Sequence, residues 1–146
     1  MRRGLTLIEL IAVLSIMAVL LAISVPKLAP IFIWRVKASS AAREIASKLL
    51  YVRSEAISAS TRCSIKFLPS AGPFKRYVIR KRIGRGWETI EEGRLPADVR
   101  VEGDPEFIFE PLGNSSSGSQ LRVSGGDQLY LISVDPVTGN VEVRKG

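Results

Sequence analysis

Glu9 is the residue of this chain whose position most clearly calls for a chemical role. It is the only charged side chain between Leu5 and Val25, a run built almost entirely of Leu, Ile, Val, Ala and Met. A carboxylate in hydrocarbon costs on the order of 2.5–3.5 kcal/mol, so Glu9 is expected to have a partner. The chemistry that suits it is an ion pair with an ammonium group at low dielectric. The alternative is a side chain that reaches headgroups and water at the membrane edge.

Other residue types that do chemistry are scarce. The chain has no histidine and one cysteine, Cys63, which excludes His-based triads, His metal sites and an intramolecular disulfide. We find no pair of carboxylates, no nucleophile with a base and no ligand cluster, and therefore predict no enzymatic activity, no catalytic residue, no cofactor and no metal site. The oxygens of residues 135–140 could hold calcium, but a hairpin turn explains the same residues more simply.

The element that positions Glu9 is predicted to be a membrane-spanning helix. As a helix, residues 5–25 would be roughly 30 Å long, which matches the hydrocarbon core of a bilayer. The run is apolar on every face, whereas a helix on the surface of a soluble domain would carry a polar stripe. Four residues precede it, Met1 to Gly4, so it differs from a secretory signal whose apolar segment is removed by cleavage.

The order Gly4-Leu5-Thr6-Leu7-Ile8-Glu9 resembles the class III signal of type IV pilins and secretion pseudopilins. That family usually has Phe where this chain has Leu5. The resemblance implies that prepilin peptidase cuts after Gly4 and that the same enzyme N-methylates Leu5. It also implies that Glu9 neutralises the new ammonium group of Leu5 on a neighbouring subunit, with help from Thr6, and so sets the register of a filament.

Beyond the apolar run, the sequence predicts a second helical part. Pro26 lies where pilins commonly carry a kinking proline, and with Pro30 it predicts a bend or a short break. Residues 36–59 then form an amphipathic helix, in which Glu44 and Lys48 are expected to pair across one turn. The apolar positions expected to pack on a domain are Ile45, Leu49, Val52 and Ala56.

After Thr61 the pattern changes to short β-branched and aromatic runs separated by Gly, Pro, Asn and Ser, which indicates antiparallel strands. A sheet of this size cannot cover both its faces, so the helix is expected to pack across one of them and give a pilin-like α+β fold. We predict strands at residues 63–68, 76–82, 87–92, 98–102, 106–110, 120–124, 129–134 and 140–144.

Residues 50–57 with the strand that follows, residues 107–113, the Ser-rich loop 114–119 and the closing hairpin resemble H-type minor pseudopilins of type II secretion and their FimT-like pilus relatives. The resemblance implies a leader at 1–4, a transmembrane and filament-core helix at 5–25, its amphipathic continuation at 26–61 and a β-rich periplasmic domain at 62–146. It implies a structural subunit held in the bacterial inner membrane by a single span, in contact with its lipid, and then incorporated in a periplasmic pseudopilus. The implied partners are other pseudopilins or pilins and the prepilin peptidase.

A basic cluster leaves a second interpretation open. The net charge is +7, and several cations lie around one predicted hairpin beside Tyr77 and Trp87. Such a surface could bind nucleic acid, and some FimT-like pilins serve DNA uptake. A solvated strand pair whose charges discourage edge aggregation explains the same residues and is the interpretation we favour. The cations are Lys75, Arg76, Arg80, Lys81, Arg82 and Arg85.

Overall fold

The computed structural model describes the backbone of residues 7–146 and the side chains of residues 7–22 and 36–146. One helix, α1 (Leu7–Ser58), occupies the first part of this range. Its backbone stays helical through Pro26 and Pro30, so no break interrupts the helix there. Each proline removes one backbone hydrogen bond, and the remaining bonds carry the helix past both positions. The chain divides into two units, one ending at Ile33 and one comprising Trp34–Gly146.

The first unit presents apolar side chains to its surroundings. Leu7 and Ile8 are each 76% exposed, and every described residue from Leu7 to Ala22 is exposed. Among the residues whose side chains are described, no helix is both long and apolar enough to cross a membrane.

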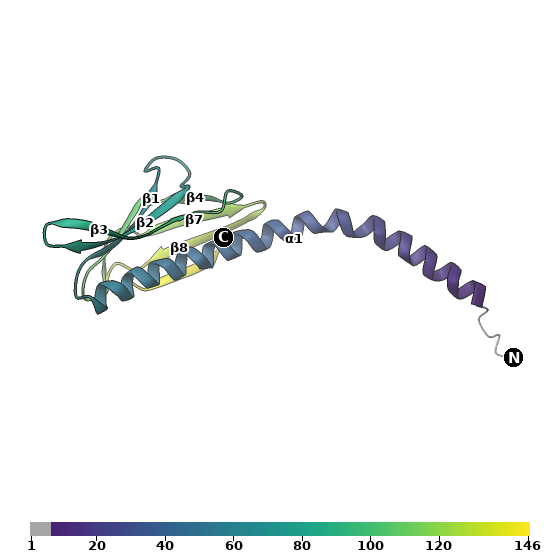
Figure 1. Ribbon diagram of the computed structural model, residues 1–146, viewed down its shortest axis with the longest axis horizontal. Helices are drawn as coiled ribbons and strands as arrows, with labels where there is room; N and C mark the ends of the chain where they lie inside the picture. Colours follow the sequence, from purple (N-terminus) through teal and green to yellow (C-terminus); the bar gives the residue numbers. More distant parts are fainter. Residues whose placement is uncertain (1–6) are drawn as a thin grey trace. The chain divides into compact units, whose positions relative to one another are not determined.

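The second half of α1 belongs to the β-rich unit and packs on it (Figure 1). The four apolar positions expected to face the domain, Ile45, Leu49, Val52 and Ala56, are all buried, which confirms the prediction. Ala38, Ala41 and Ala42 extend the same buried face toward the N-terminus. Because their side chains are small, the helix backbone can approach the strands closely.

The strands form two antiparallel sheets (Figure 1). The five-stranded sheet has the order β3-β2-β1-β5-β6 and the four-stranded sheet the order β4-β7-β8-β9. A bridge between Phe74 and Val101 connects the segment just before β2 with β4. The strands are β1 (Cys63–Leu68), β2 (Arg76–Ile83), β3 (Gly86–Arg94), β4 (Arg100–Gly103), β5 (Glu106–Phe109), β6 (Ser115–Ser117), β7 (Gln120–Gly125), β8 (Gln128–Val134) and β9 (Val141–Lys145).

All eight predicted strands are present, and each begins and ends within two residues of its predicted bounds. The α+β fold class is confirmed. The sequence does not predict strand β6, because its three serines carry no strand signal and are typical of a loop. The hydroxyl group of Ser115 donates to the carbonyl oxygen of Ser117 at 3.0 Å, and the backbone of the strand pairs with β5. This strand therefore depends on its neighbour, since its own side chains have little strand propensity.

The hydrophobic core lies between the helix and the two sheets. Phe67 stacks on Phe74 with ring centroids 5.5 Å apart and meets Phe107 edge-on at 6.2 Å. Every buried hydrophobic residue among the described ones falls between Ala38 and Val134. Residues 34–146 thus contain a complete core, and we expect this segment to fold by itself.

Candidate functional site

Glu9 lies in the first turn of α1 and is exposed, in a helix whose neighbouring side chains are exposed as well. Leaving this many apolar side chains in water is unfavourable, at about 25 cal/mol for each Å² of apolar surface. An apolar surface that surrounds a helix indicates a lipid or protein environment in the working state. The first part of α1 is therefore the candidate assembly interface, with Glu9 as its one described charged group.

The remaining residues predicted for assembly are only partly covered by the structure. Pro26 is in α1, and its side chain lies outside the described ones. Gly4, Leu5 and Thr6 lie outside the described residues altogether. Their roles in cleavage, methylation and register stay predictions.

The basic cluster does not form one continuous cationic surface. Arg80 forms an ion pair with Glu106 on β5 and lies over the Trp87 ring, 5.3 Å from its centroid. Lys81 donates to Glu55 on α1 at 3.0 Å. Two of the six predicted cations therefore have carboxylate partners, which lowers their value for binding phosphate.

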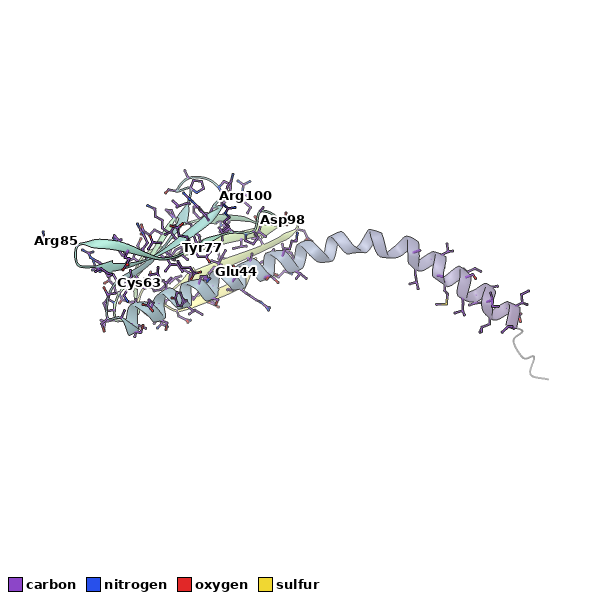
Figure 2. All side chains as sticks on the ribbon, viewed as in Figure 1. Glu44, Cys63, Tyr77, Arg85, Asp98 and Arg100 are labelled. Atoms are coloured by element: carbon purple, nitrogen blue, oxygen red, sulfur yellow. The ribbon has the colours of Figure 1, made fainter. Side chains whose placement is uncertain are left out.

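The tip of the β2–β3 hairpin carries Arg82 and Arg85. Gly84 and Arg85 form the two-residue turn, with Gly84 at a φ of 58° that favours glycine. Figure 2 shows Arg85 at this tip, far from Asp98 and Arg100. Strand β3 adds Glu88, Glu91 and Glu92, so positive and negative side chains alternate on the hairpin.

Lys75 and Arg76 lie elsewhere, at the start of β2, where they line a pocket with a volume of about 880 Å³. Arg94 at the end of β3 and Arg100 at the start of β4 line the same pocket, and the sequence analysis missed both. Each is an isolated basic residue at a strand end, so no local pattern marks it. Antiparallel pairing of β2 with β3 brings Arg94 opposite Arg76.

A polar network ties α1 to the hairpin. Lys48 forms an ion pair with Glu91 on β3, and the Tyr77 hydroxyl donates to the same carboxylate at 3.1 Å. The predicted Glu44–Lys48 pair is wrong, because Lys48 reaches across the helix–sheet interface instead. The hydrogen bond with Glu91 raises the pKa of Lys48, and the hydrogen bond from Lys48 lowers the pKa of Glu91. Burial raises the pKa of Tyr77.

This network predicts a pH-dependent contribution to stability. Because the pKa of Glu91 is lower in the folded chain than its ordinary value of 4.5, the contribution is complete above that pH and lost as the pH falls through the folded-state pKa. Glu91→Gln is expected to lower the free energy of unfolding by about 0.2–1 kcal/mol near neutral pH, since both partners are partly exposed. Urea unfolding of residues 34–146 at about pH 7 and about pH 3 measures the free energy of unfolding of both proteins. The difference between the variant and wild type should be smaller at the lower pH. Glu92→Gln is the matched control, because Glu92 is exposed on the same strand. If the two proteins differ as much in free energy of unfolding at low pH as at neutral pH, the ionised Glu91 carboxylate is not the source of the difference.

The loop considered for calcium is a turn held by its own backbone. The Asp135 carboxylate accepts from the backbone N–H groups of Val137 at 2.9 Å and Thr138 at 2.8 Å. These bonds lower the pKa of Asp135. Gly139, at a φ of 66°, packs so tightly that an added Cβ would overlap the Gly113 carbonyl oxygen. In the described part of the chain no three His, Cys, Asp or Glu residues gather to hold a metal ion.

Comparison with protein families gives two matches. Residues 1–25 match the family model described as "Prokaryotic N-terminal methylation motif". Residues 41–138 match that described as "Type II transport protein GspH". The first match covers the leader-like segment and the apolar run, and the second covers the packed part of α1 and the strands up to the final turn.

Individual proteins agree with these matches. "Pilin-like protein PilA1" of Thermus thermophilus is 38% identical over 128 residues, which cover 77% of this chain and 78% of the relative. The type IV minor pilin FimU of Pseudomonas aeruginosa has the same fold, with a TM-score of 0.65 and 20% identity over 77% of this chain and 92% of FimU. The minor pseudopilin EpsH from the type 2 secretion system of Vibrio cholerae superposes with a TM-score of 0.60 and 13% identity over 75% of this chain and 97% of EpsH.

Proposed function

Because the chain belongs to the GspH family of pilin-like proteins, we propose that it is a structural, non-enzymatic minor pseudopilin of a type II secretion system. In this role a single span holds the chain in the bacterial inner membrane, with the β-rich domain in the periplasm. The chain is then incorporated in a periplasmic pseudopilus that supports protein secretion. The observation that carries the proposal is the first part of α1, an apolar helix exposed on all sides with one carboxylate in its first turn.

The physical reason is that one helix surface serves two environments. In the membrane the apolar side chains contact lipid, and in a filament they contact the helices of neighbouring subunits, so exchange between the two costs little hydrophobic free energy. Glu9 then provides a specific contact between adjacent subunits of the filament. When cleavage after Gly4 exposes an ammonium group on Leu5, pairing with Glu9 of an adjacent subunit turns two costly charges into one ion pair.

The mature N-terminus provides the first test. Mass spectrometry of the chain isolated from its source cell is expected to show a sequence that begins at Leu5 with one added methyl group. Deletion of the prepilin peptidase gene should leave residues 1–4 attached and the methyl group absent. An unmethylated chain that retains Met1, or one cut elsewhere, would contradict the proposal and favour an unrelated single-pass protein.

A second candidate function is a minor pilin of a type IV pilus. The 38% identity with a protein named pilin-like supports it. In this role the chain would contribute to DNA uptake through the cations near the tip of the hairpin, the partly exposed Arg82 and the exposed Arg85. Deleting the gene separates the candidates, because a pseudopilin mutant should lose secreted proteins and keep its surface pili, whereas a minor pilin mutant should lose pili or transformation and keep secretion.

A further inference from the structure

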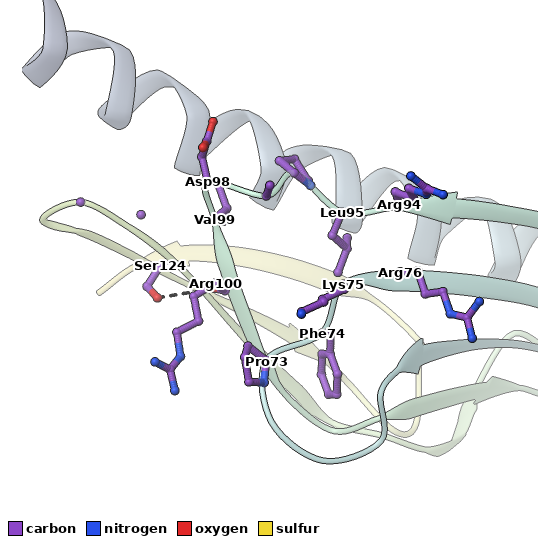
Figure 3. Close-up of a pocket in the computed structure, with 14 residues that line it drawn as sticks. Pro73, Phe74, Lys75, Arg76, Arg94, Leu95, Asp98, Val99, Arg100 and Ser124 are labelled. Atoms are coloured by element: carbon purple, nitrogen blue, oxygen red, sulfur yellow. Dashed lines mark hydrogen bonds between the residues drawn. The ribbon is translucent and has the colours of Figure 1, made fainter.

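The pocket lined by Lys75 and Arg76, here called the basic pocket, lies where β2 begins, β3 ends and β4 begins (Figure 3). Three of its lining residues, Phe74, Leu95 and Val99, are buried side chains of the hydrophobic core. They give the pocket an apolar floor. Its volume of about 880 Å³ is that of a site for several side chains or a small ligand.

The charge around this floor is strongly positive. Lys75, Arg76, Arg94 and Arg100 line the pocket, and Figure 3 shows Arg76 and Arg94 on neighbouring strands with Arg100 apart from them on β4. Its one acidic lining residue, Asp98, already binds Lys37. Arg100 pairs with Glu102. Within the described residues no carboxylate forms an ion pair with Lys75, Arg76 or Arg94.

The strand register makes this arrangement costly. Arg76 and Arg94 are direct partners across β2 and β3, and like charges in that position repel. Elsewhere on the same hairpin the fold supplies acids, as it does for Arg80 and Lys81. Two arginines at directly paired positions can each donate in a fork to a carboxylate, which would turn the repulsion into attraction.

We propose that the basic pocket binds an extended segment of a second protein in which carboxylate side chains flank an apolar one. The carboxylates lie against Arg76, Arg94 and Lys75, and the apolar side chain covers the floor formed by Phe74 and Leu95. This goes beyond the proposed function, because it assigns the chain a partner recognised by its chemistry at a surface that does not involve Glu9.

Several observations favour a peptide over nucleic acid. Binding of single strands uses several aromatic rings on which successive bases stack, and Phe74 is the one aromatic residue among those that line the pocket. Trp87 lies away from the pocket, beside Arg80. A duplex would also need a continuous basic track, and Glu88 and Glu92 interrupt the hairpin beyond Arg76.

The test uses the full chain in dodecyl maltoside micelles and isothermal titration calorimetry. The probe is the acetylated and amidated peptide Glu-Leu-Glu-Leu-Glu. We expect saturable binding that weakens by about tenfold or more in the double variant Arg76→Gln/Arg94→Gln, because two charge-assisted contacts are lost. The single variant Lys75→Gln should weaken it less. Arg85→Gln is the matched control, since it removes the same charge at the hairpin tip, and its affinity should equal that of wild type.

Two further probes define the ligand class. The peptide Glu-Gly-Glu-Gly-Glu should bind more weakly than the leucine peptide, since it leaves the floor uncovered. A short DNA duplex should bind more weakly than the leucine peptide at the same ionic strength. The inference is overturned if the double variant binds the leucine peptide as wild type does, if the glycine peptide binds equally well, or if the duplex binds more tightly and loses its affinity in the double variant.

Thermal unfolding separates lost binding from lost folding. Because the double variant removes a like-charge pair, it should unfold at the same temperature as wild type or a higher one. Binding in micelles requires no filament, so it can fail while assembly through Glu9 succeeds, and the reverse. The two proposals therefore stand or fall separately.

Discussion

Glu9→Ala is expected to reduce incorporation of the subunit into filaments by at least about 100-fold, because removing one partner of a buried ion pair costs roughly 3–5 kcal/mol. If the chain is cut after Gly4 as proposed, the cost arises from the ammonium group of Leu5, which would stay unpaired among apolar helices. The measurement is the ratio of epitope-tagged subunit in sheared or chemically crosslinked filaments to that in membranes, with the variant as the only copy.

Membrane insertion should change in the opposite direction. Taking a carboxylate out of an apolar run favours insertion by on the order of 2.5–3.5 kcal/mol, so the variant should accumulate in the membrane fraction. Glu44→Ala is the matched control, since Glu44 is an exposed acid on the same helix outside the apolar run, and its incorporation should be normal. Equal incorporation of Glu9→Ala and wild type would show that assembly does not depend on the ion pair of Glu9.

Leu49→Ala is expected to destabilise the β-rich unit strongly. The Leu49 side chain is fully buried between α1 and the strands. Truncating a buried leucine costs about 2–5 kcal/mol, because apolar contacts are lost and a cavity remains. The unfolding temperature of residues 34–146 should fall by on the order of 10 °C or more, as measured by circular dichroism.

Leu50→Ala is the matched control for this substitution. Leu50 is the next residue on the same helix and is 44% exposed, so the chemical change is identical while the burial differs. Its unfolding temperature should change by only a few degrees, since surface substitutions usually stay within about 0.5 kcal/mol. Equal losses for the two variants would mean that helix propensity, and not packing on the sheets, sets the stability of this part of α1.

Much of the fold could be predicted because its signals are local. The spacing of Ile45, Leu49 and Val52 places them on one face of a helix whatever the helix packs against. The eight predicted strands were marked by β-branched residues between turn residues, and Gly84 with Arg85 fits a two-residue hairpin turn. Strand β6 could not be predicted, because three serines become a strand only beside β5.

The sequence by itself determined the character of the N-terminal segment, where one acid, Glu9, lies in an apolar run directly after a leader-like Gly4. Only the tertiary structure decided the electrostatics of the folded unit. Lys48 forms an ion pair with Glu91, 43 residues away, and Arg80 forms one with Glu106, 26 residues away. Arg76 lies opposite Arg94 in the strand register. The physical reason is that periodicity and turn chemistry act over a few neighbouring residues, whereas charge pairing depends on which side chains the sheet register brings together in space.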